Sequence, residues 1–247
     1  MILNIDLNSV TYTCGWTGFH CACQNGQLEI AEFLMENSDT FDIDVTGAKP
    51  FYGTVFHLAC QSRHLGVANF LMKNYVALNI DFNSKNEDGH TSFHVACING
   101  STDIVELIIK KSIDLNIDLN AKCRTWGWTG FHLACEYGHY DTVKVFLKYS
   151  SDSIYSNKIN LNAPDEFGYT GFHVACREGF PKIVELIMKS SEALKINLNA
   201  KSNSVGYTGK VIDTNYSIYD YAYLLQNWAI LRFFSRIQHG LKLKVLP

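Results

Sequence analysis

The chain has 247 residues, of which 47% are hydrophobic and 18% are charged, and its formal net charge at pH 7 is −3. This composition supplies enough apolar residues for a buried core, so it excludes an intrinsically disordered chain. The near balance of acidic and basic residues argues against a nucleic-acid-binding protein. No apolar run approaches the roughly 18 residues that a membrane-spanning helix requires, and the N-terminal residues lack the pattern of a signal peptide.

The chain repeats one pattern in five copies, at intervals of 37, 37, 38 and 41 residues. Each copy reads T-x-F-H-x-A-C, and nine residues after its threonine stands a glycine in every copy but the second, which has Arg63 there. A period of this length indicates an array of stacked repeats. The threonines that open the copies are Thr17, Thr54, Thr91, Thr129 and Thr170.

Each copy predicts two helices followed by a loop. Threonine is a good N-cap, because its hydroxyl accepts a hydrogen bond from an amide of the first turn. The glycine favours the positive φ that ends a helix, so we expect Arg63 to be strained at that position. An apolar helical pattern follows, as in residues 104–109, and then a short alternating segment, as in Ile-Asp-Leu-Asn at 117–120. A polar turn that contains glycine leads to the next threonine.

These copies resemble the ankyrin repeat, whose signature is T-P-L-H-x-A followed by a helix pair. The resemblance covers nearly the whole chain. The chain departs from the family in having Gly, Val or Ser at the usual proline, Phe at the usual leucine and Cys at the usual second alanine. Its period also exceeds the family's ~33 residues, so we expect longer loops after the second helices. The resemblance implies an all-α ankyrin-repeat solenoid of about six helix–turn–helix repeats with short hairpin-like loops.

The resemblance predicts one elongated domain over residues 1–240 and a C-terminal tail at 241–247. Residues 217–222 resemble the motif of a last repeat, residues 208–216 are an insertion before it, and the apolar run 219–234 either covers the last repeat or docks a partner. No polar capping repeat precedes the first copy, which favours a fragment of a longer array over a face covered by a partner or a second copy. The predicted repeats are about 1–40, 41–78, 79–115, 116–154, 155–194 and 195–240.

The eight cysteines do not indicate disulfides or a metal site, because five of them recur once per repeat, three residues after the motif histidine. Zinc needs about four ligands at ~2.0–2.3 Å, whereas packed helices lie about 8–10 Å apart. The same separation is too long for a disulfide, whose Cα atoms lie within about 7 Å. We predict reduced cysteines, no metal, no cofactor and an intracellular location, in the cytoplasm or alternatively in the nucleus.

In ankyrin repeats, the matching histidine bonds near the helix start and to the adjoining loop. The resemblance therefore gives the motif threonines and histidines a structural role. This structural set is Thr17, His20, Thr54, His57, Thr91, His94, Thr129, His132, Thr170 and His173.

The sequence holds no catalytic motif: neither G-x-S-x-G, nor a glycine-rich phosphate loop followed by lysine, nor H-E-x-x-H. We therefore predict that the chain is not an enzyme. The resemblance implies a non-catalytic module, a monomer, that binds another protein rather than nucleic acid or a membrane. Two alternatives stay open: a targeting or regulatory array of a larger enzyme or channel, and an inhibitor that masks a transcription factor.

Partners of ankyrin arrays usually bind the loop fingers and the exposed side of the first helix, which together form a concave surface. Aromatic and arginine side chains, which interface hot spots favour, recur just before the capping threonine and at nearby positions. They either contact a partner or pack against neighbouring fingers, and the finger with Trp126 and Trp128 is the strongest candidate. The predicted partner-binding set is Trp16, Tyr52, His90, Arg124, Trp126, Trp128, Tyr137, Phe167, Tyr169 and Tyr207.

Overall fold

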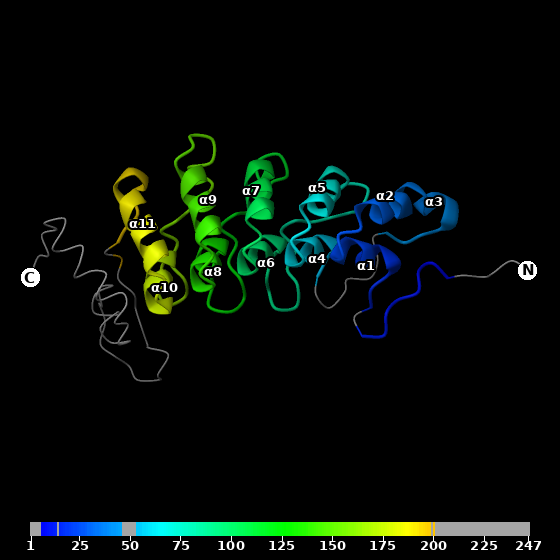
Figure 1. The fold of residues 1–247 in the computed structure, drawn as a ribbon, viewed down its shortest axis with the longest axis horizontal. Coiled ribbons are helices and arrows are strands. Elements are labelled where there is room, and N and C mark those ends of the chain that lie inside the picture. The colour runs from blue at the N-terminus through cyan, green and yellow to red at the C-terminus, as the bar shows by residue number, and fades with distance from the viewer. Residues whose placement is uncertain (1–5, 14, 46–52, 199, 201–247) are drawn as a thin grey trace, which may run out of the picture. The chain divides into compact units, whose positions relative to one another are not determined.

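The computed structural model describes residues 6–13, 15–45, 53–198 and 200. Their contacts divide the chain into an N-terminal unit, residues 1–125, and a C-terminal unit, residues 126–247. In the described ranges the secondary structure is helical apart from one isolated bridge between Lys85 and Thr91, so the all-α prediction is confirmed. Figure 1 labels the helices: α1 (Gly18–Gln24), α2 (Leu28–Glu36), α3 (Ser38–Phe41), α4 (Val55–Gln61), α5 (Leu65–Lys73), α6 (Ser92–Ile98), α7 (Thr102–Lys111), α8 (Gly130–Glu136), α9 (Tyr140–Ser150), α10 (Gly171–Glu178) and α11 (Pro181–Leu194).

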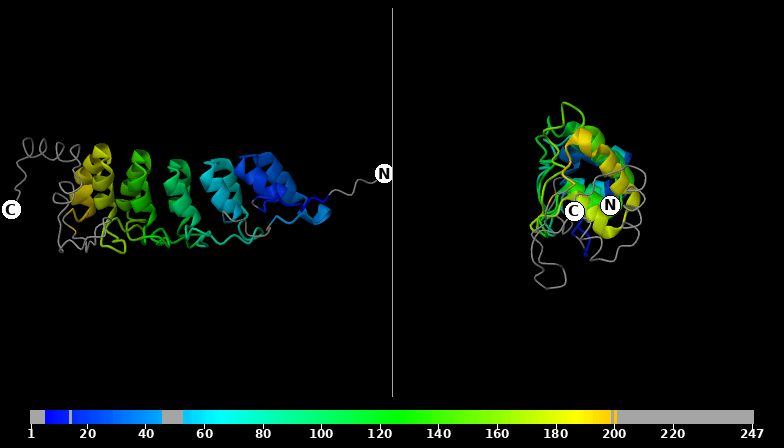
Figure 2. Two further views of the ribbon diagram at one scale, coloured as in Figure 1. Left: turned by 90° about the horizontal axis from the view of Figure 1, so that it is seen from below. Right: turned by 90° about the vertical axis from the view of Figure 1, so that its left-hand side faces the viewer.

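Each unit consists of stacked helix pairs. A first helix begins after a motif threonine and packs on the second helix that follows it, as α4 packs on α5 and α8 on α9. The first helices α1, α4 and α6 form one row in the N-terminal unit, and α8 packs on α10 in the C-terminal unit. In both units the fingers that lead into the first helices run along one side of the helix pairs (Figure 2). This arrangement places the finger residues beside the first helices.

The turn between the two helices of a pair has a left-handed residue at the position that the sequence predicts. Gly26, Gly100, Gly138 and Gly179 have φ between 61° and 77° there, and Arg63 has φ 62°, as expected. Such a conformation costs a residue with a Cβ atom about 1–2 kcal/mol. The Arg63 guanidinium donates a hydrogen bond to the carbonyl of Asn99, which helps to hold this turn.

Some of these positions also require glycine because the next repeat packs closely against them. A Cβ atom on Gly138 would lie 2.6 Å from the ring of Phe180, the residue that precedes α11. One on Gly26 would lie 2.3 Å from the His64 ring, which precedes α5. Consecutive repeats therefore pack on the turn itself, and glycine allows the contact.

The core of each unit is built from the motif residues and the apolar faces of the second helices. The ring of Phe131 packs edge-on against Phe146 of α9, with 5.4 Å between ring centroids. The motif cysteines are buried, and burial raises the pKa of Cys23 to about 12. A thiol with such a pKa is protonated at neutral pH and is unreactive, so these cysteines act as small apolar residues.

The alternating segments are turns that clamp one repeat to the next. In the N-terminal unit, the Asn83 side chain donates to the carbonyl of Asn116 and accepts from the amide of Asp118, both at 2.9 Å. In the C-terminal unit, Asn162 bonds the carbonyl of Lys195 at 3.0 Å and the amide of Asn197 at 2.7 Å. Asn8 makes the same pair of bonds to Asp42 and Asp44. The segment thus links repeats through a side-chain amide.

The single domain over residues 1–240 stays a prediction; the contacts of the chain group it into two compact units. The division falls between Thr125 and Trp126, inside the predicted repeat 116–154. Because a repeat contacts only its sequence neighbours, an array can divide without splitting a shared core. The predicted tail, and the predicted sixth repeat beyond residue 200, lie outside the described residues.

Candidate protein-binding surface

Three of the described fingers are closed by the residue just before their capping threonine. The carbonyl of Trp16 accepts from the amide of Thr11, and the carbonyl of His90 accepts from that of Asn86, both at 2.9 Å. In the C-terminal unit, the carbonyl of Tyr169 accepts from the amide of Asp165 at 2.8 Å. The backbone at this position is thus part of the finger scaffold, whatever its side chain does.

Three of the motif histidines, His57, His94 and His132, join their first helix to the finger that follows it. The Nε2 atom of His57 lies 3.1 Å from the carbonyl of His90, and that of His132 lies 2.9 Å from the carbonyl of Tyr169. Since a carbonyl only accepts, Nε2 carries the proton, and Nδ1 of His57 accepts from the Thr54 amide at 3.1 Å. The ring is therefore neutral, and burial lowers the pKa of His57 to about 4.

Trp128 lies in the interior of the C-terminal unit. Its side chain is 6% exposed, and its Nε1 atom donates to a carboxylate oxygen of Asp165 at 3.0 Å. The guanidinium carbon of Arg177 lies 5.3 Å from the centre of the indole ring. The other oxygen of Asp165 accepts from the amides of Phe167 and Tyr169, each at 2.8 Å. Trp128 thus joins two fingers and a first helix.

Trp128 stands in the finger that the sequence ranks as the strongest candidate, yet its side chain is buried. The side chain of Tyr169 is also buried, at 3% exposure. Interface hot spots need a ring face that a partner can reach, and these two rings are already enclosed by their own unit. The burial of Trp128 and Tyr169 favours packing between fingers, the second of the two interpretations that the sequence left open, and a partner-binding role for them stays a prediction.

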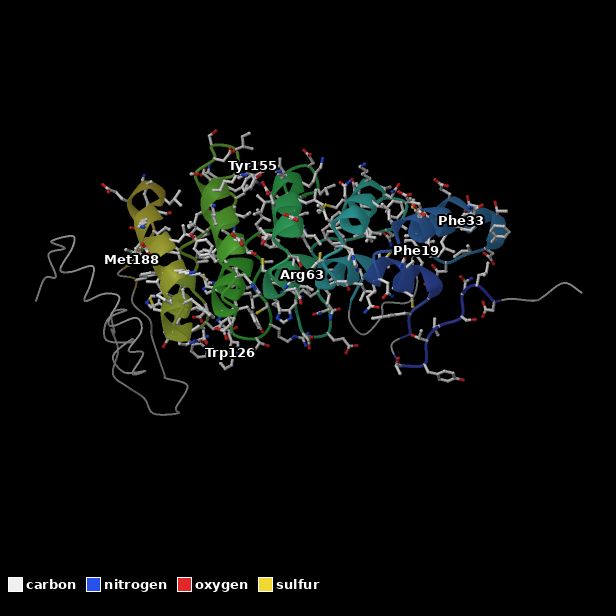
Figure 3. All side chains as sticks on the ribbon, viewed as in Figure 1. Phe19, Phe33, Arg63, Trp126, Tyr155 and Met188 are labelled. Atoms are coloured by element: carbon white, nitrogen blue, oxygen red, sulfur yellow. The ribbon has the colours of Figure 1, made fainter. Side chains whose placement is uncertain are left out.

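Trp126 has a different setting two residues earlier. Its half-buried ring lies 5.5 Å from that of Phe167 on the next finger, at an angle of 49°. The carbonyl of Trp126 accepts from the amide of Glu166 at 3.0 Å, so the two fingers are bonded edge to edge. Figure 3 shows Trp126 on the finger side of α8, opposite the loop that carries Tyr155. The pair forms an aromatic ridge at the finger edge.

Ion pairs and a stacked pair of rings lie at the C-terminal ends of α8 and α10. Arg177 is ion-paired with Glu136 and, at 2.5 Å, with Glu178. Tyr137 is 53% exposed and stacks on His139 with 6.2 Å between ring centroids. Burial raises the pKa of Glu136, and the charge of Arg177 opposes that shift. The C-terminal ends of α8 and α10 therefore carry a fixed set of ion-paired charges.

The remaining predicted residues belong to the N-terminal unit or lie outside the described ranges. Trp16 and His90 are half-buried, and Arg124 is exposed beside Gly89, where an added Cβ atom would lie 2.4 Å from the Cβ atom of Arg124. Tyr52 and Tyr207 lie outside the described residues.

The predicted site residues do not include the Asp and Asn side chains that organise these fingers. Asp165 stands five residues before a capping threonine, and Asn86 has the same place before Thr91. The Asn86 side chain accepts from the amide of His90 at 2.9 Å, as Asp165 does from that of Tyr169. An Asp or Asn at this spacing was the available signal, because such side chains accept hydrogen bonds from nearby backbone amides in turns.

The described part of the chain holds neither a candidate metal site nor a helix that could span a membrane. No three His, Cys, Asp or Glu side chains there are grouped so that they could hold a metal ion. Among the described helices, none combines the length and apolar character needed to cross a membrane.

Comparison with protein families identifies the repeats. The family described as ankyrin repeats (3 copies) matches residues 1–85, 41–120, 76–157 and 115–202, in overlapping windows. A comparison with curated proteins gives no match. Ankyrin repeats are in general protein–protein interaction modules and are typically non-catalytic. The stacked helix pairs, the threonine-capped first helices and the family match together place the chain in the ankyrin-repeat family.

Proposed function

We propose that this chain is a non-catalytic interaction module that binds a partner protein on its fingers and first helices. The observation that carries the proposal is the aromatic ridge of Trp126 and Phe167, held at the edge of two bonded fingers. A ring that is already fixed loses little conformational freedom when a partner covers it, and aromatic residues are enriched among interface hot spots. Tyr137 extends the same surface onto a first helix.

The buried rings have a supporting role in this proposal. The hydrogen bond from Trp128 to Asp165 joins the two fingers that carry the aromatic ridge. Substitution of a supporting residue is therefore expected to act through folding, whereas substitution of Trp126, which is half-buried, is expected to act mainly on binding. This difference makes the proposal testable with the two tryptophans as a matched pair.

Site-specific photo-crosslinking in source cells tests the proposal. A benzoylphenylalanine placed at residue 126 is expected to capture a partner protein, and one placed at Ile154, which is 61% exposed in the loop after α9, is not. Trp126→Ala is expected to weaken binding of the captured protein by about 1–3 kcal/mol while the melting temperature stays unchanged. Equal capture from both positions, or unaltered affinity of the Trp126 variant, would place the interaction elsewhere.

A further inference from the structure

The first repeat of the N-terminal unit leaves exposed an apolar position that later repeats bury. Ile30 of α2 stands thirteen residues after its motif threonine, and its side chain is 51% exposed. Val67 of α5 and Ile104 of α7 stand at the same distance from their threonines, and each is 1% exposed. Leu7, in the alternating segment before α1, is exposed as well, whereas Leu119 in the corresponding segment is buried. One face of the first repeat is therefore apolar and open to solvent.

Contact with a preceding repeat explains the difference. In the N-terminal unit α5 packs on α2 and α7 packs on α5, whereas no helix precedes α1 and α2 in the part of the chain that the structure describes (Figure 1). The first helices differ in the same way. A Cβ atom added to Gly171 of α10 would lie 2.5 Å from the Phe131 ring in the preceding first helix, whereas one added to Gly18 of α1 would meet no atom within 4 Å. The open face is thus the kind of face on which other repeats seat a helix.

The open side of α2 carries an apolar stripe. Ile30, Phe33 and Leu34 are spaced i, i+3 and i+4, so they share one side of the helix. The side chain of Phe33 is 57% exposed, and that of Leu34 is half-buried (Figure 3). Because the second helices α5 and α7 each pack against the second helix before them, a helix is the matching shape for an occupant of this stripe.

Charge is distributed unevenly along the chain. Residues 6–45, which form the first repeat, carry seven carboxylates and no lysine or arginine. The rest of the chain carries all 21 lysine and arginine residues and the other 17 carboxylates, and its first basic residue is Lys49, outside the described ranges. The seven carboxylates are Asp6, Glu29, Glu32, Glu36, Asp39, Asp42 and Asp44. The first repeat therefore attracts cationic groups and repels anionic ones.

Two of these carboxylates flank Phe33 on α2. Glu29 stands four residues before it and Glu36 three residues after it, so the three side chains lie along one side of the helix. Both glutamates are exposed, and neither forms a salt bridge with another described residue. The neighbouring α4 and α5 add one basic residue, Lys73, and the turn between them adds Arg63, which is bonded to the carbonyl of Asn99. A lysine or arginine of a partner can lay its aliphatic stem on the stripe and reach either glutamate with its charged end.

We propose that the α2 face, defined by Glu29, Ile30, Phe33, Leu34 and Glu36, docks a basic amphipathic helix of a partner protein. The apolar stripe and the packing of the later repeats argue for a helix, and charge complementarity argues for lysine or arginine beside its apolar side chains. The α2 face belongs to the N-terminal unit and shares no residue with the aromatic ridge. This inference therefore goes beyond the proposed function and does not depend on it.

The test selects, on the full chain, a phage-displayed library of a small helical scaffold whose exposed helix face is randomised. The expected result is enrichment of helices that combine apolar residues at i, i+3, i+4 and i+7 with lysine or arginine. The dissociation constant of an enriched scaffold, measured by fluorescence anisotropy, is expected to rise about tenfold in Ile30→Ser/Phe33→Ser. It is also expected to rise in Glu29→Gln/Glu36→Gln and with added salt.

Two matched controls lie in the same unit. Val76→Ser/Ile113→Ser removes two exposed apolar side chains from the loops after α5 and α7, and Glu87→Gln/Asp88→Asn removes two exposed carboxylates from a finger. Both controls are expected to bind the enriched scaffold as the wild type does. Circular dichroism and thermal melting establish that each variant is folded, which is expected for the α2 variants because the substituted side chains are exposed.

The other outcomes overturn the proposal in distinguishable ways. Enriched helices without a net positive charge that lose affinity in Ile30→Ser/Phe33→Ser would overturn the basic partner. Enriched helices that bind both α2 variants with wild-type affinity would overturn the α2 face, and if they lose affinity in Trp126→Ala they would support the proposed function alone. Enrichment of no helix would overturn the docking of a helix. Self-association of the chain that is lost in Ile30→Ser/Phe33→Ser would identify a second copy as the occupant in place of a partner protein.

Discussion

The fingers of the two units share a backbone plan and differ in what their side chains do. In the N-terminal unit, Lys85 donates to the carbonyl of Lys122 at 2.8 Å, so a basic side chain fastens neighbouring turns through the backbone. In the C-terminal unit, the fingers are fastened by a buried tryptophan and an aspartate, and the adjoining arginine is held between carboxylates. The closing carbonyls of His90 and Tyr169 are nevertheless used in the same way in both.

The positions that the two units share define the scaffold, and the positions that differ are candidates for recognition. Threonine caps, motif histidines and asparagine clamps recur in both units, because they satisfy backbone groups that every repeat leaves open. The positions between them carry different side chains, such as Lys85 in the N-terminal unit and Trp128 and Asp165 in the C-terminal unit. A repeat array can therefore change its partner chemistry without altering the bonds that hold the repeats together.

The largest expected effect comes from removing the buried indole ring of Trp128 in the C-terminal unit. Trp128→Ala is expected to lower the free energy of unfolding by about 3–5 kcal/mol, because it empties a packed site and breaks the bond to Asp165. At the corresponding position of the N-terminal unit, His90→Ala keeps the closing carbonyl and removes a half-buried ring, so we expect a loss of about 1 kcal/mol. Urea unfolding followed by circular dichroism measures both.

A third variant separates the ring of Trp128 from its hydrogen bond. Trp128→Phe keeps most of the apolar volume and leaves the Asp165 carboxylate with one donor fewer, so its cost is expected to fall between those of the two alanine variants. Equal losses for Trp128→Ala and His90→Ala would contradict the view that the two units fasten their fingers differently.

The second prediction concerns a feature that the units share. Burial lowers the pKa of both His57, in the N-terminal unit, and His173, in the C-terminal unit, from 6.5 to about 4. Between these two pH values the unfolded chain binds a proton at each histidine and the folded chain does not. The free energy of unfolding therefore falls as the pH drops from 6.5 to about 4, by about 3 kcal/mol for each histidine.

Urea unfolding at a series of pH values checks this prediction. His57→Gln and His173→Gln are each expected to flatten the pH dependence in this window by a similar amount, since burial lowers the pKa of both rings to about 4. A pH dependence that neither substitution changes would show that other groups cause the acid sensitivity. A change in one variant alone would show that the histidine scaffold differs between the units.

Much of the fold could be predicted from local sequence. Thr91 caps α6 because its hydroxyl and the His94 ring are three residues apart, within one turn of the chain. The left-handed turn at Gly100 and its exception at Arg63 follow from the same kind of short-range signal. The same local preferences recur in every copy of the motif. Because five copies agree, they predict helix pairs more strongly than one copy does.

The candidate surface was harder to predict because it depends on distant residues. Trp126 and Trp128 are two positions apart and look alike in the sequence, yet Trp128 is buried by Arg177 and Asp165, which belong to the next repeat. The asparagine clamps join residues that are 33–36 positions apart. The sequence of the alternating segment therefore reveals its apolar pattern but does not reveal these hydrogen bonds. Side-chain partners at such separations become visible only in the folded chain.

The smallest effect concerns the left-handed turn after the first helix, which Arg63 occupies in the N-terminal unit and Gly179 in the C-terminal unit, at φ 62° and 77°. Arg63→Ala loses the bond to Asn99 and keeps the strain, whereas Arg63→Gly loses the same bond and relieves the strain. We therefore expect Arg63→Gly to be the more stable variant, by about 1 kcal/mol in thermal unfolding. Gly179→Ala is the mirror experiment in the other unit and is expected to cost about the same. If the alanine and glycine variants of Arg63 melt together while Gly179→Ala is destabilised, then the turn of the N-terminal unit adapts to a side chain and that of the C-terminal unit does not, which would extend the difference between the units from their side chains to their backbone.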